Sequence, residues 1–362
     1  MIELSLCMIV KNETKVLNQC LSCVNELMDE IVIVDTGSKD NTKEIAAKYT
    51  DKIYDFKWIN DFSAARNFAF SKATKNYIMW LDADDILLPD DVKKLKELKE
   101  TLPPNIDSVL MKYNYAFDSN GNVSMSFYRN RIVKSDKHFQ WIEPIHEYIA
   151  VNGKALKSNI VVTHTRTHSN SVRNLEMLRE EVIKKRKISP RSQFYYAREL
   201  FDNRYYRDAI AQFKKFLDLK DTNPEERIQA CFYLSLCYSQ TNQKDHILPI
   251  LLKSFEYSIP RAEICCRIGV YFEEMEDYYS AIFWYDLATK LDPNSVNLGT
   301  ILEDYWGFIP HIQLSICYYE IHNIEEALRH LELAAAIKPD SDIVKKNQDF
   351  FKKYKKKFSI KM

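Results

Sequence analysis

The sequence contains few glycines, no long apolar run and no excess of charge of either sign. Its 362 residues include 6 glycines, and none belongs to a Gly-x-x-x-x-Gly-Lys-Ser/Thr or Gly-x-Gly-x-x-Gly loop. Neither a P-loop enzyme nor a dinucleotide-binding enzyme is therefore expected. Lysine plus arginine equals aspartate plus glutamate at 51 each. This balance lacks the positive charge expected of a nucleic-acid binder.

No segment has the pattern of a secretion signal or a membrane span. The apolar start, residues 1–10, is short and is soon followed by charged residues, and no apolar run approaches ~18 residues. The 8 cysteines lie within or beside apolar segments. No Cys-x-x-Cys pair comes with the histidine spacing of a zinc site. We therefore expect a cytoplasmic protein with reduced core thiols and no membrane span.

The length of 362 residues favours two domains, because it exceeds what one hydrophobic core usually serves. In the first half, strand patterns alternate with helical spacing. The expected strands are Leu4–Val10, Ile31–Val34, Lys52–Phe56 and Tyr77–Leu81, and the expected helices between them are Asn12–Met28, Asp40–Tyr49 and Phe62–Lys72. This order predicts an α/β fold with a mainly parallel sheet and helices on both faces.

Polar clusters follow three of these strands, at Lys11–Glu13, Asp35–Ser38 and Asp82–Asp85. In parallel sheets ligands bind beyond the carboxyl ends of the strands, so the three clusters are expected to converge on one edge. The crowded carboxylates of Asp82, Asp84 and Asp85 are typical of a Mg²⁺ or Mn²⁺ site. The alternative is a solvated acidic turn before the helix that Pro89 begins.

Two further residues give this edge the chemistry of a nucleotide site. Asp35 can bond the donor edge of a base, or it can simply cap the turn that follows it. Arg66 and backbone N–H groups at a helix start can hold phosphates, or Arg66 is an ordinary surface residue of its helix.

Four segments in this order carry a resemblance to a known family: Ser5–Glu13 (SLCMIVKNE), Ile33–Thr42 (IVDTGSKDNT), Ala64–Asn67 (AARN) and Trp80–Asp85 (WLDADD). Together they resemble the family 2 inverting glycosyltransferases of GT-A fold. The resemblance covers residues 1 to about 170 and implies a metal-dependent hexosyltransferase type of enzyme with a UDP-sugar donor. It implies that Val10 and Glu13 line the nucleoside and that Asp35 meets the base.

The same resemblance implies the remaining donor contacts and the metal ligands. Arg66 would contact the pyrophosphate, and Asp82 the ribose or the sugar. Asp84 would bind Mn²⁺ or Mg²⁺. Relatives often place a histidine on the metal at the end of this region, so His164 is a candidate ligand; the other interpretation is a satisfied polar residue at a strand end. Where relatives have a glycine and an aromatic residue after this histidine, this chain has Thr165, Arg166, Thr167 and His168. Two alternatives therefore stay open: Arg166 lies near the phosphates, or the assignment of His164 is wrong.

A second polar cluster, around Trp141–Glu147, follows a predicted hairpin whose turn is Ser119–Asn122. Inverting transfer needs a carboxylate that takes the proton of the acceptor. Glu147 matches the position where relatives carry a paired acid motif and is the predicted base, with Glu143 as its rival. His146 is a candidate for the chemistry or a residue that supports the acceptor loop.

From Ser189 onward the pattern is helical and repeats. The spacing of Ile268–Pro293 recurs in Leu314–Pro339, with earlier units that begin near Tyr196 and Leu234. Small and large residues at these positions are the signature of tetratricopeptide repeats, so the aromatic stripe is expected to be core. We predict a GT-A domain over 1–175, a linking helix over 176–188, about four repeats over 189–341 and a lysine-rich capping tail over 342–362.

The pairing of the two domains suggests the acceptor. A tetratricopeptide groove usually holds a peptide, and relatives with this pairing resemble flagellin glycosyltransferases and enzymes that modify Ser, Thr or Cys of small peptides. We therefore expect transfer to a protein or peptide, with homo-oligomer contacts as another use of the repeats. The alternatives are a cell-envelope polysaccharide or lipid-linked glycan transferase that uses the repeats for assembly, and an inactive transferase that serves as a repeat scaffold.

Overall fold

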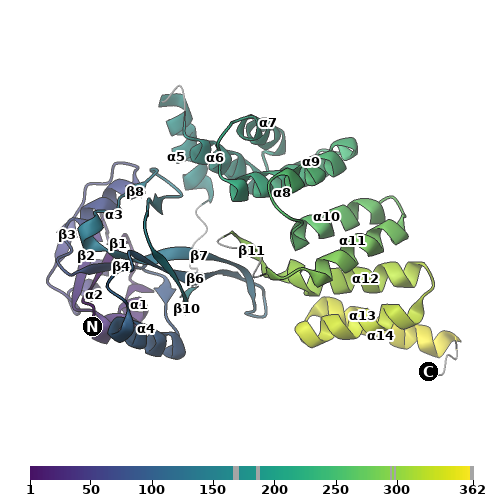
Figure 1. The fold of residues 1–362 in the computed structure, drawn as a ribbon, viewed down its shortest axis with the longest axis horizontal. Helices are drawn as coiled ribbons and strands as arrows, with labels where there is room; N and C mark the ends of the chain where they lie inside the picture. The colour runs from purple at the N-terminus through teal and green to yellow at the C-terminus, as the bar shows by residue number, and fades with distance from the viewer. Residues whose placement is uncertain (166–170, 185–187, 294–295, 297–298, 359–362) are drawn as a thin grey trace. The chain divides into compact units, whose positions relative to one another are not determined.

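A computed structural model describes residues 1–165, 171–184, 188–293, 296 and 299–358 (Figure 1). The chain forms two compact units. The first comprises Met1–Ala116 and Ser126–Lys187, and the second comprises Phe117–Met125 and Ile188–Met362. A short hairpin tip thus counts with the second unit, an assignment that the sequence did not suggest. The finer boundaries at 175, 188 and 341 remain predictions.

The first unit is an α/β domain, as predicted. Its strands are β1 (Leu4–Val10), β2 (Glu30–Asp35), β3 (Ile53–Asp55), β4 (Tyr77–Trp80), β5 (Asp85–Ile86), β6 (Ser108–Phe117), β7 (Val123–Lys134), β8 (Trp141–Ile142), β9 (Tyr148–Ile149) and β10 (Ala155–His164). Its helices are α1 (Leu17–Val24), α2 (Thr42–Ala46), α3 (Phe62–Phe70), α4 (Pro89–Thr101) and α5 (Ser171–Lys184), with short 3-10 turns at Asn25–Leu27 and Ser135–Lys137.

The main sheet has the strand order β3-β2-β1-β4-β7-β6-β10-β5. The pairs β2–β3, β1–β2, β1–β4 and β6–β10 are parallel, whereas β4–β7 and β5–β10 are antiparallel. Strands β8 and β9 form a separate antiparallel pair. The alternation of the first four strands with three helices confirms the predicted βα order, and the antiparallel partners make the sheet mixed.

Helices cover both faces of this sheet, and the side chains of its strands alternate between the two apolar cores that result. Leu6 and Met8 of β1 belong to the core that contains Leu17 and Leu21 of α1. Cys7, between them, belongs to the opposite core, which contains Ala69 of α3. This period of two is what a strand buried on both faces requires.

Helix α1 is shorter than the predicted Asn12–Met28 segment. Asn12 has a positive φ of 58°, and the N–H groups of the next two residues bond to the first residue of α2 and to the segment before it instead of starting a helix. The N–H of Glu13 donates to Thr42 Oγ1 at 2.7 Å, and that of Thr14 donates to Asp40 at 3.3 Å. The prediction from apolar spacing therefore placed the start of the helix too early, because spacing along the chain does not report these contacts with distant residues.

The second unit is a stack of helices, as predicted. They are α6 (Pro190–Asp202), α7 (Tyr206–Leu217), α8 (Pro224–Gln240), α9 (Ile247–Lys253), α10 (Ala262–Glu273), α11 (Tyr278–Lys290), α12 (Phe308–Glu320), α13 (Ile324–Ile337) and α14 (Asp342–Phe358). The unit also has 3-10 turns at Lys244–His246, Ser254–Glu256 and Glu303–Trp306, and the short strand β11 (Ile301–Leu302). Each helix from α6 to α14 packs on the next. No helix in the described part of the chain is long and apolar enough to cross a membrane.

The small and large residues of the repeat pattern meet in the cores between these helices. A Cβ added at Gly269 in α10 would lie 2.6 Å from the ring of Tyr285 in α11. Ala281, Tyr285 and Ala288 are fully buried on α11. The aromatic stripe is therefore core, as expected.

Candidate active site

The carboxyl ends of β1, β2 and β4 bring the predicted polar clusters together. Val10 pairs with Asp35 in the parallel register of β1 and β2. The side chain of Asn12 accepts from the N–H of Lys39 at 2.8 Å, and its N–H donates to Ser38 at 2.9 Å. A surface cavity of about 320 Å³, lined by residues from Asn12 to Val16 and by Asp40 and Asn41, opens beside them.

One carboxylate oxygen of Asp35 accepts hydrogen bonds within the described residues, and the other accepts none there. Its side chain is buried, and Oδ1 accepts from the N–H groups of Gly37 and Ser38, both at 2.9 Å. Gly37 permits this turn because its φ is 105°. Oδ2 is buried and has no hydrogen-bond partner among the described residues. An unpaired buried acceptor is costly, so Oδ2 is suited to receive a donor from a ligand.

Val10 and Glu13 lie at the same edge of the sheet. Val10 is buried at the end of β1. Burial and the negative charges of Asp84 and Asp82 raise the pKa of Glu13 to about 7. Carboxylates from the segment after β1 and from the turn after β4 are therefore close enough to repel one another.

The turn after β4 is anchored by Asp85, a residue for which the sequence gave no separate role. Asp85 and Arg131 of β7 are both fully buried, and Arg131 Nη1 donates to Asp85 Oδ2 at 2.8 Å. The same oxygen accepts from the N–H of Asp82 at 3.0 Å, and Oδ1 accepts from the hydroxyl of Tyr113 at 2.7 Å. Burial opposes ionisation, but Arg131 outweighs it and lowers the pKa of Asp85. With both oxygens engaged, Asp85 acts as an anchor for the turn.

Asp84 and His164 remain as candidate cation ligands. Asp84 Oδ1 lies 3.5 Å from His164 Nδ1, and Asp84, Asp85 and His164 form a cluster of suitable ligand atoms. The carbonyl of Asp84 accepts from the N–H and hydroxyl of Thr165 at 2.7 and 2.8 Å. A carboxylate beside an imidazole fits Mn²⁺ and, less naturally, Mg²⁺.

The imidazole of His164 is held by two tyrosines. Its Nδ1 lies 2.9 Å from the hydroxyl of Tyr113, and the ring stacks on that of Tyr115 at a centroid distance of 5.3 Å. Burial lowers the pKa of His164, but the hydrogen bond to Asp85 and the charge of Asp84 outweigh it, so the pKa is raised.

Arg66 joins the donor side of the site to the predicted base. Its Nη2 donates to Asp82 Oδ1 at 2.6 Å, and its Nε donates to Glu147 Oε1 at 2.7 Å. Burial opposes the charge on Glu147, but Arg66 and Arg129 outweigh it and lower the pKa of this carboxyl. Asp82 and Glu147 are thus brought to one guanidinium from segments far apart in the chain.

The loop between β8 and β9 carries the three candidate acceptor-side residues. Glu143 and His146 have positive φ values of 75° and 52°, a strained conformation for residues with side chains. The loop is tied to the start of α3, where the hydroxyl of Ser63 donates to the carbonyl of Glu143 and the N–H of Phe62 donates to that of Pro144. Of the three candidates, Glu147 bonds to Arg66. Arg166 and His168 lie outside the described residues.

Sequence reasoning grouped Asp85 with Asp82 and Asp84 as carboxylates of a metal site, whereas its side chain bonds to Arg131 and Tyr113. It missed Tyr113 and Arg131 as parts of this site. The available signal was weak: Arg131 is a charged residue next to apolar Ile132 and Val133 in a predicted strand. Only the pairing of β4 with β7 reveals that this arginine reaches the acidic turn.

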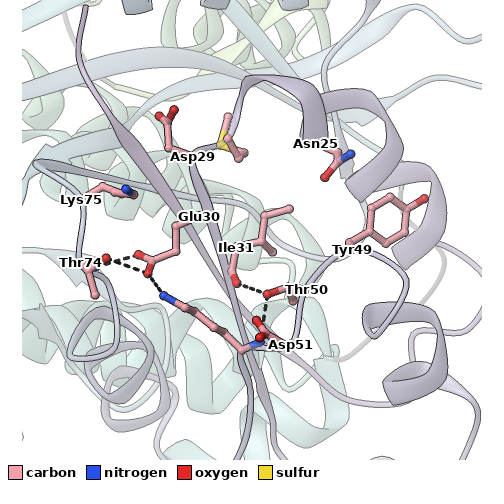
Figure 2. Close-up of a pocket in the computed structure, with 11 residues that line it drawn as sticks. Asn25, Asp29, Glu30, Ile31, Tyr49, Thr50, Asp51, Thr74 and Lys75 are labelled. Atoms are coloured by element: carbon pink, nitrogen blue, oxygen red, sulfur yellow. Dashed lines mark hydrogen bonds and ion pairs between the residues drawn. The ribbon is translucent and has the colours of Figure 1, made fainter.

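A second cavity, of about 340 Å³, lies at the opposite edge of the sheet, near the amino ends of β2 and β3 (Figure 2). Glu30 borders it, and its buried carboxylate accepts from Lys52 Nζ and from the N–H and hydroxyl of Thr74 at 2.7 and 2.9 Å (Figure 2). The hydroxyl of Ser5 also donates to it. The carboxylate of Glu30 thus links β1, the segment before β3 and the segment before β4.

Comparison with known proteins agrees with this geometry. Residues 5–152 match the family described as Glycosyl transferase family 2, and residues 262–295 match the tetratricopeptide repeat. The chain therefore joins a family 2 glycosyltransferase domain to tetratricopeptide repeats.

Individual relatives share parts of this organisation. A TPR repeat-containing protein of Synechococcus elongatus is 36% identical over 149 residues, which are 41% of this chain and 36% of that protein. The SPbeta prophage-derived glycosyltransferase SunS of Bacillus subtilis is 26% identical over 313 residues, which are 82% of this chain and 70% of SunS. The chain thus spans about a third of the first relative and about two thirds of the second.

Solved structures of MamA are similar to 45–48% of the chain, for example at a TM-score of 0.36 with 20% identity over 86% of MamA and at 0.39 with 17% identity over 89%. TM-scores at this level support no conclusion about function.

Proposed function

We propose that this protein is an inverting glycosyltransferase that moves a sugar from a UDP-sugar to a Ser, Thr or Cys side chain of a polypeptide. Two observations carry the proposal: Asp35, Asp82 and Asp84 lie where the parallel strands β2 and β4 end, and Arg66 bonds to both Asp82 and Glu147. The match to a family 2 domain supports the reaction class.

The donor occupies the edge formed by β1, β2 and β4. Val10 and Glu13 border the nucleoside, and the unpaired Oδ2 of Asp35 accepts the imide N–H of uracil. Asp82 contacts the ribose or the sugar. Arg66 brings positive charge to the side where the resemblance places the pyrophosphate.

Asp84 and His164 hold Mn²⁺ or Mg²⁺ in this proposal. The bound ion would neutralise charge on the departing diphosphate. The recorded distance of 3.5 Å between Asp84 Oδ1 and His164 Nδ1 supports the pairing of these two ligands.

Glu147 acts as the general base. It takes the proton from the acceptor hydroxyl or thiol as that oxygen or sulfur bonds to the anomeric carbon. The bond from the anomeric carbon to the diphosphate breaks, and its electron pair leaves with UDP. The lowered pKa of Glu147 keeps the carboxylate ionised and ready to accept.

The repeats support a polypeptide acceptor, because stacked tetratricopeptide helices commonly present a surface to a peptide. The test is intact mass spectrometry of candidate polypeptides after incubation with a panel of UDP-sugars and Mn²⁺. A mass increase of one sugar is expected. Elongation of a free or lipid-linked glycan without modification of any polypeptide would favour the cell-envelope alternative instead.

The base assignment is tested by Glu147→Gln, with Glu143→Gln as its matched partner in the same loop. The glutamine still offers an acceptor oxygen to Arg66, so UDP should bind nearly normally. Turnover should fall by roughly 10² to 10⁴, as for loss of a general base. If Glu143→Gln is instead the crippled variant, Glu143 is the base.

A further inference from the structure

Arg66 is held more tightly than a flexible phosphate-binding arginine needs to be. Its guanidinium carbon lies 4.9 Å from the ring centroid of Trp80 and 4.7 Å from that of Trp141. The side chain is only 8% exposed. Aromatic faces on a planar guanidinium fix its orientation as well as its position.

Its donors point to two carboxylates with different tasks. Nη2 reaches Asp82, in the turn after β4, and Nε reaches Glu147, at the end of the loop before β9. Because the fork of a guanidinium is rigid, the two bonds fix the spacing between these carboxylates.

We infer that Arg66 is a positioning residue that fixes the base Glu147 against the donor-side carboxylate Asp82, beyond any contact it makes with the pyrophosphate. This inference rests on the proposed function, in which Asp82 faces the donor and Glu147 accepts the proton. A base must lie within hydrogen-bond reach of the acceptor, and small displacements of such groups are costly. The loop that carries Glu147 has two residues with positive φ, a conformation that persists only where surrounding contacts hold the backbone in place. The bond from Arg66 to Glu147 is one such contact.

The same contact sets the charge of Glu147. The charged groups recorded against this carboxyl are Arg66 of α3 and Arg129 of β7, and Arg129 also donates to the Glu147 carbonyl at 3.2 Å. Loss of Arg66 leaves a buried carboxyl with one cation fewer, so the pKa of Glu147 should rise. The acid limb of the pH–rate profile should then move to higher pH.

The experiment compares Arg66→Gln and Arg66→Lys with the wild type and with Lys72→Gln. Lys72 lies just beyond the end of α3, against the rings of Tyr54 and Phe68, and its loss removes one positive charge outside the site. The readouts are UDP affinity by calorimetry with Mn²⁺, and kcat and kcat/KM for hydrolysis of the best donor in a UDP-sugar panel from about pH 3.5 to about pH 9, a range that includes the region below 4.5 where the lowered pKa of Glu147 places the acid limb.

We expect Arg66→Gln to lower kcat by about 10²-fold and to move the acid limb upward by about one pH unit or more. Arg66→Lys should restore charge but not the fork, so the limb should return toward its original position while kcat stays low. Lys72→Gln should match the wild type. An unmoved acid limb in Arg66→Gln, with loss confined to UDP affinity, would show a phosphate ligand only and overturn the inference.

A second measurement separates this inference from the proposed function. The urea midpoints of Arg66→Gln, Glu147→Gln and the double variant form a cycle that needs no substrate. Non-additive midpoints would support the Arg66–Glu147 interaction even if no UDP-sugar is hydrolysed. In that case the proposed function would be wrong, whereas the positioning role of Arg66 would stand. Additive midpoints would overturn the inference while leaving the transferase proposal standing.

Discussion

Glu30 offers a test of how the sheet is held together away from the active site. Its carboxylate accepts from Ser5 on β1, from Lys52 before β3 and from Thr74 before β4. The side chain is 3% exposed. Glu30→Gln keeps the size of the side chain but removes its charge. It also replaces one acceptor oxygen by an amide N–H₂, which faces the donor groups and cannot accept a hydrogen bond from them. The first unit should therefore be less stable.

The magnitude follows from the pKa of this carboxyl. Burial opposes ionisation, but the bonds from Lys52 and Ser5 outweigh it and lower the pKa of Glu30 from 4.5 to about 2. At about 1.4 kcal/mol per pH unit, this difference corresponds to about 3 kcal/mol of unfolding free energy. Because the pKa is lowered in the folded state, this stabilisation is fully present well above pH 4.5. It is lost as the pH falls from about 4.5 toward 2.

The assay is urea unfolding followed by tryptophan fluorescence, in a background with Trp284→Phe and Trp306→Phe. Of the 5 tryptophans, the three that remain then all lie in the first unit. The difference between wild type and Glu30→Gln should be about 3 kcal/mol at pH 7 and should shrink by about 2 kcal/mol by pH 3.

Glu26→Gln, at an exposed position near the same cavity, is the control and should show little change at any pH. A constant difference for Glu30→Gln from pH 7 to pH 3 would refute an ionised anchor.

Two further substitutions test other parts of the molecule. Asp84→Ala should abolish Mn²⁺ binding, measured by electron paramagnetic resonance, and donor hydrolysis, whereas exposed Asp90→Asn should change neither; full turnover of the wild type in excess EDTA would contradict the metal assignment. Gly269→Ala should destabilise the repeats by about 1–3 kcal/mol because its Cβ would lie 2.6 Å from the ring of Tyr285. Ser315→Ala, at the equivalent position of the next repeat, should be tolerated, and equal thermal shifts for both would count against this packing.

The sequence predicted the fold well because apolar periodicity reports which side chains face a core. The βα order up to Trp80 and the paired helices after Ser189 follow from that periodicity alone. Helix α1 was predicted too long because its true start depends on bonds from Glu13 to Thr42 and from Thr14 to Asp40, almost thirty residues away. Periodicity contains no information about such contacts.

The site was predictable where residues follow strands directly and not where it depends on strand pairing. Asp35 and Asp84 could be proposed because parallel strands end at one edge. The anchor formed by Asp85 and Arg131 could not, because it requires that β7 returns antiparallel beside β4. The bond from Arg66 to Glu147 spans 81 residues, and spacing along the chain does not reveal it.

The register of β10 has a consequence for the candidate metal pair. His164 faces Asp85 directly in the antiparallel ladder with β5. Farther back, β10 carries two residues more than β6 between Lys157 and Val161, an irregularity in which the hydroxyl of Ser158 donates to the carbonyl of Leu110. An even number of extra residues preserves the alternation of faces, whereas the loss of one residue there would turn every later side chain of β10 to the other face. The imidazole would then point away from Asp84 and the candidate metal site although His164 itself is unchanged. The length of this irregularity therefore matters to the site as much as the histidine does.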